Sequence, residues 1–128
     1  MSLPPRVAVF DADERCPRLP LVAGAGEAYA VVWPGVGAEM RSMHRISLGP
    51  GSATVSQRHP MEAVYAVIGG GGSVRDPDTG TADALVDGAI FHVEPGTAYV
   101  VEAGAGGIEL VGGPCPADPA LYHSLAAA

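Results

Sequence analysis

The chain has 128 residues, which is enough for one compact domain with a sizeable core. Its seven basic residues are all arginine and are outnumbered by fourteen acidic residues. The resulting net charge of −7 would repel phosphate backbones. We therefore expect neither nucleic acid nor an anionic membrane as a partner. The 18 glycines and 12 prolines interrupt the apolar runs every few residues, so no run approaches the ~20 residues needed to span a bilayer.

The first 20 residues are expected to form an extended N-terminal arm. Its prolines and the charged run at 11–15 leave room for at most a short edge strand at 7–10. Such a segment leaves backbone pairing groups exposed unless another strand covers it, so we expect a homodimer in which it pairs with a second copy. The first residues lack the apolar core of a signal peptide, and Cys16 and Cys115 show no paired spacing. Both features favour a cytoplasmic protein with reduced cysteines.

From residue 28 onward, short β-rich segments recur at intervals of about ten residues, which is typical of a sandwich or barrel. We expect strands at 28–33, 43–48, 53–58, 63–68, 73–76, 89–93, 98–103 and 107–111. Clusters of Gly, Pro and Asp separate these segments, and the glycine runs 69–72 and 104–107 predict turns, the first of them a hairpin. The tail at 113–128 has room for one helical turn.

The two-residue period of a strand predicts which side chains face the interior. Residues 45 and 47 are polar, so His44 should point inward. Residues 54, 56 and 58 are polar, which places residues 53 and 55 with Gln57 and His59 on the core side. By the same reasoning Tyr99 faces the core, because Glu102 marks the even positions of its segment as outward.

Two segments resemble the sequence motifs of the cupin superfamily. The first spans 51–70 and keeps His59 in place, but Gln57 stands where the motif has its first histidine and Ala63 where it has a glutamate. The second spans 88–99 and has Tyr99 at the motif's histidine position. The resemblance covers 24–116 and implies an all-β, single-domain bacterial protein, a cupin-type antiparallel β-barrel or jelly roll (double-stranded β-helix). We expect an arm at 1–20, the barrel at 21–112 and a tail at 113–128.

Parity and motif position together bring His59, Gln57, Tyr99 and His44 toward one cavity, with Tyr65 alongside. His59 is the central candidate because it is retained at its motif position and histidine is the commonest metal-binding side chain. It is expected to act as a catalytic residue with Tyr99, or to anchor one divalent metal ion: zinc, manganese, nickel or iron. A site without metal is the alternative.

The residues expected near His59 in the cavity can be interpreted in more than one way. Gln57 can bind a metal through its carbonyl oxygen or form hydrogen bonds to a ligand. Tyr99 can be a metal ligand as a phenolate, a general acid or base, or a lining aromatic. His44 can replace the missing metal-binding histidine, contact the ligand or bond to the backbone, and Tyr65 is expected to contact the ligand.

Glu62 and His92 are expected at the surface. Glu62 is one residue away from the motif's glutamate position, and a one-residue slip reverses the face of a strand. His92 shares the parity of the polar residue Glu94. If Glu62 joined the histidines, the chain would have the two-histidine, one-carboxylate set of oxygen-activating iron enzymes. Dioxygenase chemistry is therefore the less favoured possibility.

The sequence thus predicts a small-molecule cupin with a polar cavity. As an enzyme, it would carry out cyclisation, isomerisation or elimination on a small organic metabolite or natural-product intermediate, with or without a metal. The alternative is a non-catalytic ligand-binding or sensor cupin that lacks metal.

Overall fold

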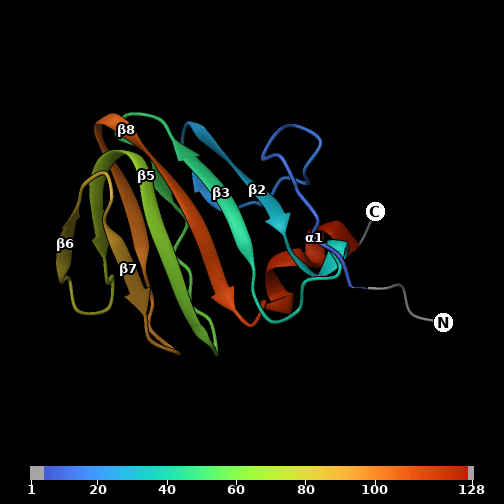
Figure 1. The fold of residues 1–128 in the computed structure, drawn as a ribbon. Coiled ribbons are helices and arrows are strands. Elements are labelled where there is room, and N and C mark those ends of the chain that lie inside the picture. Colours follow the sequence, from blue (N-terminus) through green and yellow to red (C-terminus); the bar gives the residue numbers. More distant parts are fainter. Residues whose placement is uncertain (1–4, 127–128) are drawn as a thin grey trace.

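The computed structural model describes residues 5–126, and eight antiparallel strands in it form a nearly closed barrel (Figure 1). The predicted all-β antiparallel barrel is confirmed. The strands are β1 (Val22–Ala23), β2 (Gly26–Val32), β3 (Met43–Leu48), β4 (Ala53–Thr54), β5 (Glu62–Arg75), β6 (Ala82–Leu85), β7 (Ile90–Val93) and β8 (Val100–Cys115). Two 3-10 helices, η1 (Pro34–Val36) and η2 (Pro119–Tyr122), and the single turn α1 (His123–Ala126) complete the fold. Within residues 5–126, no helix is long and apolar enough to cross a membrane.

The long strands β5 and β8 hold the barrel together. They pair with each other over most of their length. The other edge of β5 pairs with β7 near its start and with β6 near its end, whereas β8 continues to β3 and β4. Figure 1 shows β6 and β7 on one side of this pair and β3 and β2 on the other.

Both glycine runs that predicted turns lie inside these two strands, so the turn predictions are wrong. The register between β5 and β8 shifts at this point, but neither strand ends. A Cβ added to Gly70 would lie 2.2 Å from the carbonyl oxygen of Gly107, and one added to Gly72 would lie 2.0 Å from that of Glu102. These glycines therefore allow the backbones of two paired strands to approach closely, and they do not form a turn.

The other strand predictions differ in outcome. The strands expected at 28–33, 43–48 and 89–93 correspond to β2, β3 and β7. Residues 7–10 form no strand, and β1 and β6 were not predicted.

The predicted strand at 53–58 is reduced to Ala53–Thr54, and the inward direction of residues 53 and 55 is wrong. Thr54 is buried, whereas Val55 is 37% exposed. The hydroxyl of Thr54 accepts a hydrogen bond from the backbone N of Val101 at 3.0 Å. A polar side chain with a partner in the barrel wall thus takes the inner position.

Candidate functional site

All five residues that the sequence predicts to face the interior site are buried, so their inward direction is confirmed. At most 5% of the surface of each is exposed: His44, Gln57, His59, Tyr65 and Tyr99. The structure brings them together. His59 and Tyr65 hydrogen-bond to Tyr99, and Gln57 pairs with Tyr99 through the backbone. His44 lies close enough to His59 for its pKa to be affected. The functional roles of all five residues stay predictions.

Four side chains form one hydrogen-bonded chain, which we call the proton network: Asp118, His59, Tyr99 and Tyr65. His59 lies at its centre, with Nδ1 at 2.7 Å from Asp118 Oδ2 and Nε2 at 2.8 Å from the hydroxyl of Tyr99. The hydroxyls of Tyr99 and Tyr65 are 3.2 Å apart. An imidazole held between a carboxylate and a hydroxyl can take up and return a proton.

The backbone fixes His59 and Tyr99 relative to each other. The segment after β4 runs beside the residues that precede β8, where Gln57 and Tyr99 exchange two backbone hydrogen bonds of 3.0 and 2.9 Å. The carbonyl oxygen of His59 accepts a bond from the N–H of Gly96 at 2.8 Å. The rings of His59 and Tyr99 are thereby held with centroids 5.6 Å apart.

The C-terminal tail supplies two site residues, Asp118 and Tyr122, that the sequence analysis missed. Asp118 is the N-cap of η2, with Oδ1 accepting from the N–H of Ala120 at 3.1 Å, and its other oxygen faces His59. The hydroxyl of Tyr122 lies 2.7 Å from Nε2 of His44. An Asp followed by Pro is a recognisable signal for the start of a helix. That signal could have identified the cap, but it does not reveal which side chain the cap meets.

Burial keeps the phenols and His44 of this interior uncharged at neutral pH. It is the main cause that raises the pKa of Tyr65 to about 12 and the pKa of Tyr99 far above its ordinary value, where the neighbouring Tyr65 adds to the effect. Burial also lowers the pKa of His44 to about 4, and the nearby His59 shifts it in the same direction. A phenolate at Tyr99 is therefore disfavoured.

Three buried polar atoms near the proton network have no hydrogen-bond partner among the described residues. They are both amide atoms of Gln57 and Nδ1 of His44. Leaving such an atom unsatisfied costs about 1–3 kcal/mol, so most buried polar groups in folded proteins do have partners. Gln57 therefore has a donor group and an acceptor without a protein partner in the described chain, and its contact with a ligand stays a prediction.

The residues predicted as metal ligands do not fit a resident metal ion in this arrangement. Both ring nitrogens of His59 are engaged in hydrogen bonds, and Tyr99 is held as a neutral phenol. Nε2 of His44 is engaged as well, by Tyr122, so Nδ1 of His44 and the amide oxygen of Gln57 are the atoms of the predicted set that have no partner in the described chain. Among residues 5–126, no three His, Cys, Asp or Glu side chains come together as a group that could hold a metal ion. To bind a metal, His59 would have to release Asp118 or Tyr99.

Glu62 and His92 are exposed and hydrogen-bond to each other at 2.9 Å, so their predicted surface positions are confirmed, and His92 also lines the cleft described below. Their side chains are 54% and 51% exposed. The ligand set of an oxygen-activating iron site would need Glu62 inside, and the strand does not place it there.

A cleft with a volume of about 660 Å³ meets the proton network at Tyr99, which forms part of its wall. Phe91 also lines the cleft and stacks on Tyr65 with ring centroids 5.3 Å apart. The remaining wall combines apolar, acidic and basic side chains, among them Val74, Leu85, Ile90, Val93, Asp76, Asp83, Glu94, Arg75 and His92. A small organic molecule in this cleft would lie against Tyr99.

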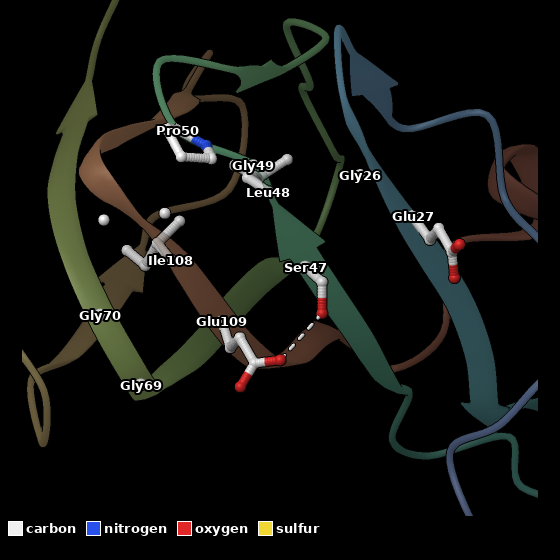
Figure 2. Close-up of a pocket in the computed structure, with 12 residues that line it drawn as sticks. Gly26, Glu27, Ser47, Leu48, Gly49, Pro50, Gly69, Gly70, Ile108 and Glu109 are labelled. Atoms are coloured by element: carbon white, nitrogen blue, oxygen red, sulfur yellow. Dashed lines mark hydrogen bonds between the residues drawn. The ribbon is translucent and has the colours of Figure 1, made fainter.

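A second hollow, with a volume of about 590 Å³, lies where β2 and β3 meet the glycine-rich parts of β5 and β8 (Figure 2). Figure 2 shows Ser47 hydrogen-bonded to Glu109, which also accepts a bond from Arg45. Its wall is largely glycine backbone and includes no residue of the proton network. The cleft at Tyr99 is therefore the candidate site.

No protein-family model matches the sequence, and no curated protein matches it either. Solved structures do match. A cupin-like protein from Thermotoga maritima superposes with a TM-score of 0.70 at 16% identity, covering 86% of this chain and 82% of that one. A predicted oxalate decarboxylase from the same organism gives a TM-score of 0.69 at 19% identity, with 85% and 99% of the two chains covered. The polyketide cyclase RemF from Streptomyces resistomycificus gives 0.64 at 18% identity, with 88% and 80% covered. The chain therefore has the cupin fold.

Proposed function

We propose that this cupin binds a small organic metabolite or natural-product intermediate in the cleft at Tyr99 and catalyses a proton transfer that leads to cyclisation, isomerisation or elimination. The observation that carries the proposal is His59 held between a carboxylate at 2.7 Å and the Tyr99 hydroxyl at 2.8 Å. One end of this network lies on the cleft wall and the other in the C-terminal tail.

The chemistry follows from the order of the groups. A proton leaving the ligand is taken up by the oxygen of Tyr99 while Tyr99 passes its own proton to Nε2 of His59. Asp118 stabilises the imidazolium that forms. Tyr99 never becomes a free phenolate, which is consistent with its raised pKa. Return of the proton through Tyr99 to another ligand atom completes an isomerisation. In an elimination the proton returns to the leaving group, and in a cyclisation it returns to the ligand atom that gains electrons when the ring closes.

The fold does not choose among these reactions, because one cupin fold carries different activities. Among the similar structures, one is described as a polyketide cyclase and another as a predicted oxalate decarboxylase. The residues of the proton network are what favour proton transfer for this chain.

Exchange of carbon-bound hydrogen for deuterium tests the proposal with simple compounds in place of the natural substrate. Enolisable β-keto compounds and phenols are incubated with the protein in D₂O, and loss of carbon-bound proton signals is followed by NMR. We expect exchange catalysed by the wild type and lost in Tyr99→Phe and His59→Gln. Glu62→Gln, which changes an exposed carboxylate, is the matched control and should retain the activity.

Binding of these compounds without any exchange would instead support the alternative, a non-catalytic ligand-binding or sensor cupin. The competing metal-assisted version is decided by elemental analysis of the purified protein for zinc, manganese, nickel and iron, with His59→Ala for comparison. Stoichiometric metal in the wild type that is absent from His59→Ala would replace the metal-free proposal.

A further inference from the structure

We infer that Asp118 is a positioning residue that sets the direction of every hydrogen bond in the proton network, and that it thereby commits the site to ligands that present a hydroxyl or N–H donor to Tyr99. The ligand part of this inference rests on the proposed function, because it requires the cleft to bind a small molecule. The direction of the hydrogen bonds stands on the geometry alone.

The direction follows from the number of protons that each group carries. As a carboxylate, Asp118 can only accept, so the proton of neutral His59 lies on Nδ1 and points at Asp118. Nε2 is then a bare acceptor, and the group 2.8 Å away, the hydroxyl of Tyr99, must donate to it. Tyr99 has one proton and has used it, so Tyr65 donates to Tyr99 across their 3.2 Å contact.

Tyr99 therefore has no proton to offer a bound molecule and can only accept from it. The cleft wall carries three carboxylates, Asp76, Asp83 and Glu94. In the described part of the chain, the basic side chains on that wall are Arg75 and His92, and each already contacts a carboxylate outside the cleft: Nε of Arg75 is 2.8 Å from Glu102, and Nε2 of His92 is 2.9 Å from Glu62. An anionic ligand would be repelled, so the structure favours an uncharged alcohol, phenol, enol or amide.

The tautomer of His59 is the first test, and NMR reads it directly. In ¹⁵N-labelled protein at pH 8, above the ordinary histidine pKa of about 6.5, long-range ¹H–¹⁵N correlation spectra distinguish the protonated ring nitrogen from the bare one. We expect Nδ1–H in the wild type. In Asp118→Asn the side-chain oxygen is held at the helix cap by the N–H of Ala120, which turns the NH₂ group toward His59. That donor should switch the imidazole to Nε2–H.

Two control variants separate this effect from general damage to the site. Tyr122→Phe alters the tail at its contact with His44 and should leave the Nδ1–H tautomer in place. Tyr99→Phe removes the other partner of His59 and should leave it in place too, because Asp118 alone sets it. An Nε2–H or doubly protonated His59 in the wild type would overturn the inference, as would Asp118→Asn with an unchanged tautomer.

A pair of aromatic probes tests the ligand class. The cleft is lined by Phe91 and aliphatic side chains, so 2-naphthol and its methyl ether are suitable and differ in a single donor. Affinities come from NMR shifts of the cleft residues. We expect the wild type to prefer 2-naphthol by about tenfold, the worth of one hydrogen bond, and Asp118→Asn to lose this preference.

Equal affinities for the two probes, or no binding of either, would overturn the assignment of a donor ligand. The tautomer result decides the role of Asp118 independently of that outcome. Neither result depends on deuterium exchange, so failure of the proposed reaction and failure of this inference remain distinguishable.

Discussion

Gln57 combines two properties that rarely occur together in a stable core. Its side chain is buried, with 5% of the residue exposed, and both of its amide atoms lack a protein partner in the described chain. Burying an amide without hydrogen bonds is costly because the group gives up its bonds to water. A residue of this kind lowers the stability of the protein.

Replacement of Gln57 by leucine should therefore stabilise the free protein. The two side chains are similar in size, and the change removes two unsatisfied polar atoms, so we expect the free energy of unfolding in urea to rise by about 1–2 kcal/mol. Thr54→Val is the contrasting control, because it removes a buried hydroxyl that is bonded to the backbone of Val101 and should destabilise. A loss of stability in Gln57→Leu would show that the amide already has a partner.

His44 should make stability fall as the solution is acidified. Its pKa is about 4 in the folded protein and 6.5 as the reference value, and burial is the main cause of the difference. Between these two values the unfolded chain binds a proton that the folded chain does not. The free energy of unfolding should therefore decrease from about pH 6.5 down to pH 4, by about 3 kcal/mol in total for this one group.

Urea titrations at several pH values, compared between the wild type and His44→Gln, isolate that contribution from those of the carboxylates. We expect the difference in unfolding free energy between the two proteins to change over this pH range and to be constant above it. Parallel curves at all pH values would mean that His44 is accessible to protons in the folded state.

Alternation alone predicts the inward direction of His44, and alternation together with motif position predicts that of His59 and Tyr99. The sequence does not predict Asp118 or Tyr122. Their contacts with His59 and His44 join residues 59 and 78 positions apart in the chain. No local period links such residues, and only the path of the tail beside the barrel brings them together. The same contacts engage Nδ1 of His59 and Nε2 of His44, whereas Nδ1 of His44 and the amide of Gln57 have no partner in the described chain.

At the scale of the strand, the glycine runs show why local signals fail in this fold. A run of glycine between two apolar segments is the usual sign of a turn. In β5 and β8, Gly70, Gly72 and Gly107 of these runs are required because another backbone occupies the space of a side chain. A turn and a close approach of two strands therefore both appear in the sequence as a run of glycines. The long-range register between β5 and β8 decides between them, and it is not visible in either segment alone.

The close approach of these two strands predicts a large difference between two substitutions of glycine by alanine. At Gly72 the added Cβ would lie 2.0 Å from the carbonyl oxygen of Glu102, so Gly72→Ala must displace one strand and should destabilise by about 3 kcal/mol. Gly106 is exposed and has no atom within 4 Å of its Cβ position, so Gly106→Ala should change stability by less than about 0.5 kcal/mol. Chemical denaturation measures both, and equal effects would contradict the close approach of β5 and β8.

At the scale of the whole molecule, the N-terminal arm remains without a role in the isolated chain. Residues 7–10 form no strand, and Val7 and Val9 are 92% and 86% exposed. A short apolar segment in extended conformation can pair with the edge of another sheet. Soluble proteins seldom leave such a segment uncovered without a binding function.

We propose that a second copy of the chain covers this arm, so that the protein is a homodimer. Light scattering at micromolar concentration should give twice the mass of the chain, and removal of residues 1–10 should give the monomer mass. A Val7→Asp, Val9→Asp variant keeps the length of the arm and adds charge to a chain of net charge −7, so it should also dissociate the dimer. Asp87→Asn, an exposed substitution far along the chain, should leave the mass unchanged. A monomeric wild type, or a dimer that persists after the arm is removed, would mean that the arm is not the interface.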